Sequence, residues 1–463
     1  MPTPQHSPLL CSLLSLGLLG LGCSDDTTAI DSDSSEDTNS SSETDESDSS
    51  ETSDTDDSEG DGDGDPTDSG DGDGDDIPAC SFVWEATQMK LNGQVHAGFD
   101  LAVAPDGSLI ATGRIEQEQE QDYELWIGKF DPAGEPLWEQ TLAAAGNDYG
   151  NGVAVDEAGE VYVVGSLGEG FADNIWVSKR SGSDGSELWA VTRSSEFDGD
   201  NLPGGIAFGP EGRLFVSGTV RAGDDDTDIW IGEYSTQDGS LSWSGSFSGQ
   251  TDPNGFSIDR AGSLSITPQG QAYVGGTEGV NFETREGVLV AFDTKGSSDA
   301  LWRFAPQANG EAHEHSNSAV LAGPDEEAYV VLRQTSGEWA FWLYRVDASG
   351  QIEWELSEQD FVYGTTDNWD VNGLELRENG QISIGGTLIE EEVGQAISWS
   401  EVWVANLTRD GQGQCIESHT WQNENIIPAS TFGYGFAEGP GGTAVIGEIR
   451  NGPTNYLWVG GYK

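Results

Sequence analysis

Alternating apolar and polar positions recur along this chain in short runs, and each run follows a tight turn. In residues 156–165 the turn passes into a strand that places Val161 and Val163 on one face and Tyr162 and Val164 on the other. The run is short, rich in β-branched and aromatic residues and bounded by glycine, which favours a strand over a helix. Similar stretches begin at Pro105, Pro210, Pro268, Pro324, Glu378 and Pro440.

The seven copies align on one turn position. Proline presets φ at the start of such a turn, and glycine accepts the positive φ that its end requires. Successive copies are 52 to 62 residues apart, a spacing typical of an array of four-stranded units. The residues at the shared position are Gly107, Gly159, Gly212, Gly270, Glu326, Gly380 and Gly442.

Tryptophan marks two further strands in most copies, and a short strand before the turn brings the expected number to four per copy. A third strand begins near Trp126, Trp176, Trp230, Val288, Trp342, Trp403 and Trp458. A fourth strand follows a glycine-containing hairpin and carries Trp138, Trp189, Trp243, Trp302 or Trp354. The pattern therefore predicts seven sheets of four strands each.

The seventh copy reaches Lys463 with only three of its strands. Residues 81–85, which include Trp84, have the pattern of the missing fourth strand. Pairing of the two chain ends would complete one blade and remove the exposed edges of an open array. We therefore predict an all-β fold: one seven-bladed β-propeller over residues 80–463.

The repeat resembles a known family. Residues 146–165, GNDYGNGVAVDEAGEVYVVG, are similar to the seven-bladed propeller repeat of secreted bacterial proteins. The pattern Asp-x-x-Gly-x-x-x-Trp at residues 131–138 and 347–354 resembles the tryptophan-docking motif of quinoprotein-type propellers. That resemblance implies that each such tryptophan packs between blades, on a turn of the neighbouring blade. A shared fold does not by itself fix a function.

The N-terminal residues predict export. The apolar run at residues 9–21 is shorter than the roughly 18–20 residues needed to span a bilayer, and it indicates a signal peptide over residues 1–22. Gly20-Leu21-Gly22-Cys23 resembles the lipobox of bacterial lipoproteins, which implies acylation of Cys23. Gly20 departs from the usual leucine, and no Lys or Arg precedes the apolar run, so an ordinary cleaved signal is the alternative.

Residues 23–79 form an acidic linker of Ser, Thr, Asp, Glu and Gly. Residues 24–79 hold 23 acidic side chains and no basic one, and they cannot bury enough surface to fold. We expect a disordered tether with a root-mean-square span of ~40 Å. The net charge of −65 repels nucleic-acid phosphate and excludes DNA or RNA as a partner. A lipid anchor is then the only expected link to a membrane, at the outer membrane or cell surface; without it the protein would be periplasmic or extracellular.

Two cysteines remain for the folded part once Cys11 and Cys23 are assigned to the signal and the anchor. Cys80 precedes the predicted closing strand, and Cys415 takes the place of the fourth-strand tryptophan in the sixth copy. An even pair in an exported protein favours a disulfide that secures ring closure. Two buried thiols that never meet are the alternative.

Ligand chemistry is expected where the loops between the fourth and first and between the second and third strands meet, because these are the long polar parts of each copy. Acidic and aromatic residues there suit a carbohydrate or protein ligand, although solvated loops of an acidic protein have a similar composition. Two histidines, His313 and His315, are weak metal-ligand candidates. The candidate ligand-binding residues are Asp360, Tyr363, Asp367, Trp369 and Trp399.

Catalytic signatures are absent from the sequence: it has no Gly-x-Ser-x-Gly elbow, no P-loop and no His-Glu-x-x-His. We therefore predict no catalytic residue and no cofactor, and we expect a monomeric binding or scaffold protein of the cell envelope. Two alternatives stay open. One is a propeller enzyme, either a quinoprotein-like oxidoreductase or a glycan-acting hydrolase. The other is an envelope assembly factor.

Overall fold

The fold is given by a computed structural model of the whole chain. It describes residues 82–88, 95–116, 122–144, 146–168, 174–194, 201–223, 226–252, 256–279, 285–306, 315–334, 340–361, 368–377, 379–390, 399–419, 430–439, 442–451 and 454–462.

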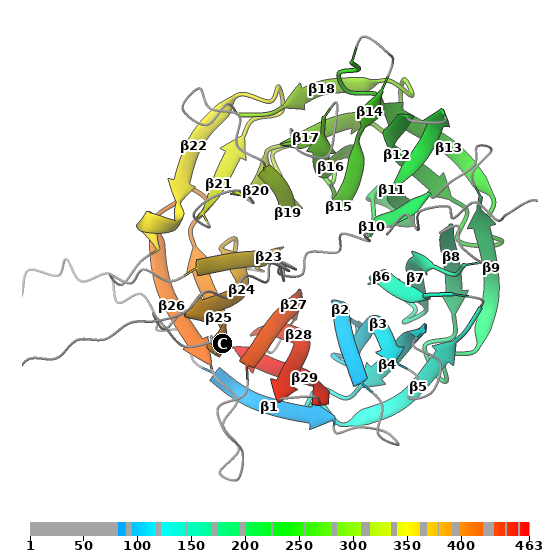
Figure 1. Cartoon of the computed structure of the whole chain (residues 1–463), viewed down its shortest axis with the longest axis vertical. Helices are drawn as coiled ribbons and strands as arrows, with labels where there is room; N and C mark the ends of the chain where they lie inside the picture. The colour runs from blue at the N-terminus through cyan, green and yellow to red at the C-terminus, as the bar shows by residue number, and fades with distance from the viewer. Residues whose placement is uncertain are drawn as a thin grey trace, which may run out of the picture. The chain divides into compact units, whose positions relative to one another are not determined.

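Seven antiparallel sheets of strands connected up and down stand in a ring around a central axis, as predicted (Figure 1). Within each blade the first strand lies nearest the axis and the fourth lies at the circumference. The first blade contains β2 (Val95–Val103), β3 (Leu109–Glu116), β4 (Tyr123–Phe130) and β5 (Pro136–Leu142). The second contains β6 (Tyr149–Val155), β7 (Val161–Ser166), β8 (Ile175–Arg180) and β9 (Glu187–Arg193). The third contains β10 (Leu202–Phe208), β11 (Leu214–Gly223), β12 (Asp226–Tyr234), β13 (Leu241–Phe247) and the added short strand β14 (Ser257–Ile258), with the 3-10 turn η1 (Pro210–Gly212).

The remaining blades follow the same order. The fourth contains β15 (Arg260–Ile266), β16 (Gln271–Glu278), β17 (Glu286–Asp293) and β18 (Ala300–Phe304). The fifth contains β19 (His315–Ala322), β20 (Ala328–Gln334), β21 (Ala340–Val346) and β22 (Ile352–Ser357), followed by η2 (Glu358–Asp360). The sixth contains β23 (Asn368–Leu376), β24 (Ile382–Glu390), β25 (Trp399–Leu407) and β26 (Gly413–His419). The seventh contains β27 (Ser430–Gly439), β28 (Gly442–Asn451), β29 (Thr454–Tyr462) and β1 (Phe82–Gln88).

The two ends of the chain close the ring in the predicted way. β1 is the outermost strand of the seventh blade and pairs antiparallel with β29. Trp84 lies opposite Gly461 on the strand that carries Trp458. The edge that β29 would otherwise expose is therefore covered by a strand from the other end of the chain.

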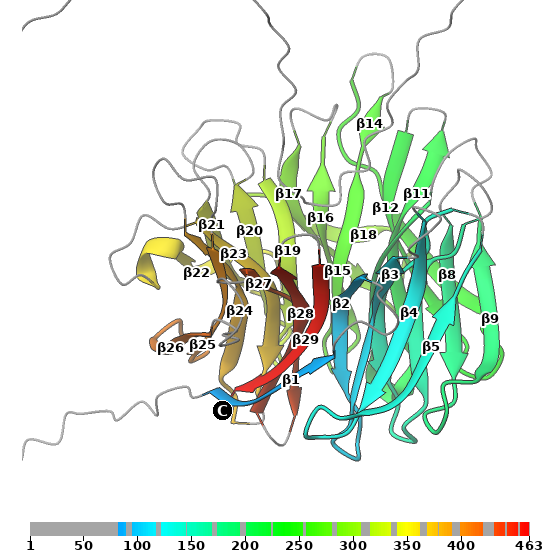
Figure 2. The same ribbon diagram turned by 60° about the horizontal axis from the view of Figure 1, so that its bottom comes forward.

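The hairpins between the first and second strands, together with those between the third and fourth, lie at one end of the ring, which we call the turn end. The remaining connections lie at the opposite end, the loop end (Figure 2).

Glycine takes positive φ at the shared turn position, for example 80° at Gly107 and 83° at Gly159. Glu326 takes the same conformation, with φ 66°, at the one copy that lacks glycine. The seventh hairpin is shorter, because Gly439 pairs directly with Gly442.

The hydrophobic core lies mainly between neighbouring blades. One cluster joins Tyr162 and Ile175 of the second blade to Leu214 and Trp230 of the third. A comparable cluster joins the seventh blade to the first. Both faces of each sheet are thus covered by adjacent blades, which is why the middle strands are apolar at consecutive positions.

Fourth-strand tryptophans dock on the next blade, as the resemblance implied. Each indole Nε1 donates to a carbonyl in the turn between the third and fourth strands of the following blade. The four pairs are Trp138 with Gly182 at 3.2 Å, Trp189 with Thr236 at 3.2 Å, Trp302 with Ala348 at 2.7 Å and Trp354 with Arg409 at 3.1 Å.

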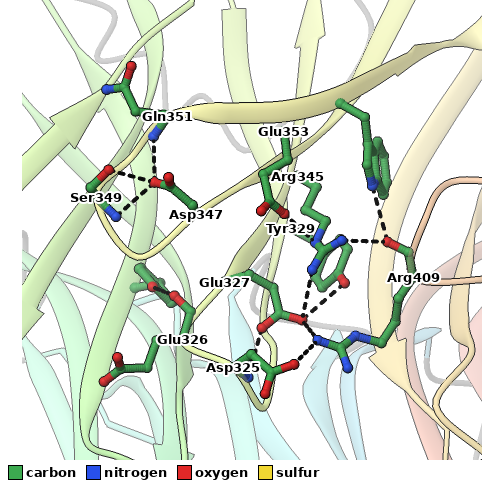
Figure 3. A network of polar contacts seen from close by, with 12 residues as sticks. Asp325, Glu326, Glu327, Tyr329, Arg345, Asp347, Ser349, Gln351, Glu353 and Arg409 are labelled. Atoms are coloured by element: carbon green, nitrogen blue, oxygen red, sulfur yellow. Dashed lines mark hydrogen bonds and ion pairs between the residues drawn. The ribbon is translucent and has the colours of Figure 1, made fainter.

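A cation reinforces this docking, as Figure 3 shows for the fifth and sixth blades. The carbonyl of Arg409 accepts from Trp354 Nε1 and, at 3.1 Å, from Arg345 Nη1. The buried Glu327 carboxylate pairs with Arg345 at 3.7 Å and also contacts the Arg409 guanidinium, which reaches Asp325 at 2.8 Å. We call this arrangement, in which a fourth-strand tryptophan and a third-strand cation share one carbonyl of the next blade, the docking clamp.

The docking clamp recurs at two other seams. Lys129 Nζ donates to the Gly182 carbonyl at 3.1 Å, beside the indole of Trp138. Lys179 Nζ donates to the Thr236 carbonyl at 3.4 Å. Each clamp satisfies a turn carbonyl and both donors at once, so that neighbouring blades are held in fixed register at the turn end.

Candidate functional site

The structure gives a place to some of the candidate ligand-binding residues. The Asp360 carboxylate accepts from the backbone N–H and the hydroxyl of Ser357, at 2.7 and 3.0 Å, and so caps η2. Trp369 lies opposite Leu388 and Trp399 opposite Glu390, so both flank the loop-end half of β24. The side chains of these two tryptophans, together with Tyr363 and Asp367, lie outside the described residues.

The cysteine and histidine candidates are placed only in part. Cys415 lies opposite Asn406 in β26, in the register of the fourth-strand tryptophans, and His315 begins β19 opposite Gln334. Their side chains, together with Cys23, Cys80 and His313, lie outside the described residues, so the anchor, the disulfide and the metal site stay predictions.

Each first strand carries a β-bulge at the same point of its pairing with the second strand. Bulges re-aim side chains and cluster near functional sites. In five blades the residue at the bulge is small or an amide, and Asn151 and Asn372 each donate to a carbonyl of the next blade. In the first and seventh blades, which are neighbours, the residue is instead the aromatic Phe99 or Tyr434.

These two rings belong to a continuous row of flat side chains. Phe432 stacks on Tyr434 with the planes 7° apart, and Tyr434 meets Phe99 edge-on at 6.2 Å. The Arg114 guanidinium lies over Phe99 at 5.4 Å and over Tyr123 at 4.1 Å. All five side chains are part-buried. We call Phe432, Tyr434, Phe99, Arg114 and Tyr123 the aromatic row.

Local contacts hold the aromatic row in place. The Tyr434 hydroxyl donates to Glu448 Oε1 at 3.1 Å, on the adjacent strand β28. The backbones of the two blades approach closely here, because a Cβ added at Gly435 would lie 2.7 Å from the Cα of Asp100. The row is thus fixed by strands rather than by loops, which favours a preformed binding surface.

Two carboxyl groups on first strands have raised pKa values, and only Asp100 is next to a member of the row. Asp100, next to Phe99, accepts the backbone N–H of Val153 of the second blade at 2.8 Å. Burial raises the pKa of Asp100 to about 7, against the lowering effect of that hydrogen bond. Burial raises the pKa of Glu375 in β23 to about 8, and the negative charges of Asp100 and Glu438 add to the effect. Near neutral pH these groups exist partly as acids, which can donate as well as accept hydrogen bonds.

A separate set of three aspartates lies at the loop end of the third blade. Burial raises the pKa of Asp226, Asp228 and Asp259, that of Asp228 to about 6. Asp259 is fully buried and accepts from the Ser257 hydroxyl at 3.0 Å and from the backbone N–H of Gly279 at 3.4 Å. These bonds fasten β14 and its flanking loops to the sheet, which is a structural role.

Within the described ranges, no group of three His, Cys, Asp or Glu residues is arranged to hold a metal ion. Nor does any helix there have the length and apolar character needed to cross a membrane. What the described loop end offers is stacking surface beside carboxyl groups, and such a surface can bind a ligand with exposed C–H faces and hydroxyl groups.

Sequence reasoning missed every member of the aromatic row. The signal was present in the repeat alignment, since Phe99 and Tyr434 occupy the place of Asn151 in GNGVAV. The sequence prediction placed ligand binding in the long loops, whereas the row is built on strand residues at the seam where the ring closes. Only the predicted closure brings the seventh blade beside the first.

Comparison with known proteins identifies no family for this chain. No protein-family model matches the chain, and no curated protein matches it. Among solved structures, the Dos1 propeller is 11% identical, with 82% of this chain and 95% of that chain covered and a TM-score of 0.47. Quinohemoprotein alcohol dehydrogenase from Comamonas testosteroni is 10% identical, with 82% and 76% covered and a TM-score of 0.46. The polysaccharide lyase Uly1 is 9% identical, with 79% and 90% covered and a TM-score of 0.49. Similarity at this level carries no argument about this chain.

Proposed function

We propose that this protein is an exported, lipid-anchored binding protein that presents the loop end of its propeller to a carbohydrate or protein ligand at the cell envelope. The observation that carries the proposal is the aromatic row. Rigid, part-exposed rings with adjacent hydrogen-bonding groups are typical of binding surfaces, because they contribute contact area with little loss of side-chain entropy.

Export and anchoring rest on the sequence. The signal peptide over residues 1–22, Cys23 and the acidic linker over residues 23–79 together form a tether that would hold the propeller over residues 80–463 away from a membrane. Cys23→Ser tests the anchor: the variant should leave the membrane fraction for the soluble fraction, and the mature N-terminal peptide should lose its acyl mass. Retention of the variant in the membrane would contradict the anchor.

Binding by the aromatic row is tested on an array of glycans and envelope proteins. We expect the whole protein to bind a discrete class of ligand, and Tyr434→Ala to weaken that binding at least tenfold. Leu301→Ala is the matched control, because Leu301 is an exposed apolar residue on the circumferential strand β18. Equal loss in both variants would remove the row from the proposal.

A glycan-acting hydrolase is the second candidate, and the raised pKa values of Asp100 and Glu375 favour it. Carboxyl groups that remain protonated near neutral pH are suited to general acid catalysis. Incubation with each bound glycan, followed by mass spectrometry of the products, separates the two functions. Cleavage that Glu375→Gln abolishes would replace binding with hydrolysis.

A further inference from the structure

The seam between the seventh and first blades differs at the turn end from the seams that follow the second and fifth blades. In the second blade Tyr162 lies directly opposite Lys179, whose ammonium group is 4.9 Å from the centre of the tyrosine ring. In the fifth blade Tyr329 lies opposite Arg345 in the same way, at 5.8 Å. In both blades the tyrosine ring and its cation lie in the space between that blade and the following one.

Neighbouring contacts show what fills that space. The Tyr162 ring packs edge-on against Phe208 of the third blade at 5.2 Å. The corresponding ring in the fourth blade, Tyr273, donates its hydroxyl to the backbone carbonyl of Glu326 in the fifth blade. A tyrosine at this position thus uses both its apolar face and its hydroxyl on the next blade.

In the seventh blade the strand register places Ala444 at the position of the tyrosine and Gly461 at the position of the cation. Ala444 lies directly opposite Gly461, and Gly461 follows Trp458 by three residues, as Lys179 follows Trp176. These two positions of the seventh blade therefore carry neither the tyrosine nor the cation of the second and fifth blades. Two small residues leave volume that the larger side chains occupy at the seams after the second and fifth blades.

A cavity of about 320 Å³ lies at this place. Val103, Leu109 and Ala444 give it apolar walls, and exposed Pro105 and Pro132 border it toward solvent. We call it the seam cavity. Its volume is sufficient for an aromatic side chain, since ligand pockets begin at roughly 300 Å³.

The polar groups of the seam cavity match a phenol and a cation. Gly107 lines it and holds the turn position that Glu326 holds in the fifth blade, where the carbonyl accepts the Tyr273 hydroxyl. Asp106 also lines it, and its carboxylate is 64% exposed, next to Lys129. Its hydrogen bonds to Ser108 lower the pKa of Asp106, so it stays anionic. An incoming cation would therefore meet a negative charge.

The N-terminal segment of this chain cannot supply such an occupant. Residues 24–79 contain no aromatic and no basic side chain, and residues 1–22 contain no aromatic one. The net charge of −65 favours a basic partner over a second copy of this acidic chain.

We propose that the seam cavity is a docking site for a partner polypeptide that inserts a tyrosine flanked by lysine or arginine. The inserted ring takes the place that Tyr162 and Tyr329 take at their own seams, and the flanking cation takes the place of Lys179 and Arg345. The site lies at the turn end, on the face opposite the aromatic row, and does not depend on the function proposed for that row.

The test uses the full-length protein and two short peptides, acetyl-Lys-Tyr-Lys-amide and acetyl-Lys-Ala-Lys-amide, titrated by calorimetry. We expect saturable binding of the tyrosine peptide and at least tenfold weaker binding of the alanine peptide. Ala444→Tyr, which fills the cavity from within, should weaken binding of the tyrosine peptide at least tenfold, whereas Tyr434→Ala in the aromatic row should leave it unchanged. Equal binding of both peptides, or no saturable binding, overturns the proposal.

A second measurement covers the case in which Ala444→Tyr fails to fold. p-Cresol is titrated into the wild-type protein with labelled methyl groups. We expect the chemical-shift changes to be confined to the methyl groups of Val103, Leu109 and Ala444, which line the cavity. Changes spread over the whole ring, or none at millimolar p-cresol, also overturn the proposal.

Discussion

The turn end and the loop end of the propeller use the same strands for different purposes. At the turn end, blade after blade repeats one set of contacts: positive φ at the turn position, a docked tryptophan and, at three seams, the docking clamp. At the loop end the described residues differ from blade to blade. The bulges of the other five first strands carry no aromatic residue like Phe99 or Tyr434 of the aromatic row.

The difference separates the contacts that hold the blades together from the side chains that are available to a ligand. Contacts that repeat at successive seams set the angle between blades, so a change there acts on stability. Side chains that occur in one place only contribute little to assembly and are available for a ligand. Substitutions at the two ends should therefore change different measured quantities, and the variants at the docking clamp and in the aromatic row test that separation directly.

The largest effect is expected at the docking clamp. Glu327→Gln removes the charge that the Arg345 and Arg409 guanidinium groups share, and it leaves two cations close together. Loss of one partner of a buried ion pair costs about 3–5 kcal/mol, and because these arginines are part-exposed we expect about 2–4 kcal/mol. Urea unfolding measures the change, and ligand binding at the loop end should be unaffected.

Glu187→Gln is the matched control for this substitution. It also removes one carboxylate from an arginine, Arg180, at 3.3 Å, but Glu187 is 51% exposed. An exposed pair contributes about 0–1 kcal/mol. If both variants lose the same stability, the buried clamp has no special role.

The second prediction concerns pH and the two raised pKa values. Asp100 and Glu375 have ordinary values of 3.8 and 4.5 when unfolded and values of about 7 and about 8 when folded. At pH values between the pKa of the unfolded state and that of the folded state, the folded protein binds more protons than the unfolded chain. The free energy of unfolding therefore falls as pH rises through this range. We expect a loss of about 1–3 kcal/mol from pH 5 to pH 8, discounted for partial exposure and coupling of the two groups.

The double variant Asp100→Asn with Glu375→Gln should have a flatter dependence over the same pH range, because neither amide titrates. The asparagine keeps an oxygen that can accept the Val153 N–H. Parallel wild-type and variant profiles, from urea unfolding at each pH, would assign the dependence to other groups.

A smaller effect is expected for Arg114→Met at the loop end. Methionine keeps an apolar stem over the ring of Tyr123 but removes the cation, which contributes about 0.5–1 kcal/mol over an exposed aromatic ring. Ligand affinity should fall by roughly two- to fivefold, while the midpoint of thermal unfolding stays within about two degrees of the wild type. A large shift in that midpoint with unchanged affinity would reverse the roles of the two ends.

The smallest effect is expected at Glu326, whose φ of 66° is the conformation that glycine adopts at the equivalent turns. Glu326→Gly relieves that strain and keeps the carbonyl that accepts from Tyr273, so we expect a gain of about 0.5–1 kcal/mol in urea unfolding. Gly159→Glu is the reciprocal variant. Nothing lies within 4 Å of a Cβ at Gly159, so only backbone strain should lower its stability. Loss of stability in both variants would show that the turn depends on the glutamate side chain.

The architecture could be predicted from the sequence because it depends on local signals repeated seven times. Turn glycines, alternating strands and paired tryptophans fixed the number of blades, and Trp84 indicated how the ring closes. The aromatic row and the seam cavity could not be predicted in this way. Both depend on which side chains meet across the seam between the seventh and first blades, and Ala444 and Gly461 are inconspicuous until register places them opposite each other.

The placement of β1 has a consequence for the order in which the chain folds. During synthesis β1 emerges before any other described strand, yet its partner β29 emerges after all of them. The ring therefore stays incomplete until β29 has been made, and so distant a pairing makes this closing step slow. Until then the unpaired edge of β1 is exposed to other chains.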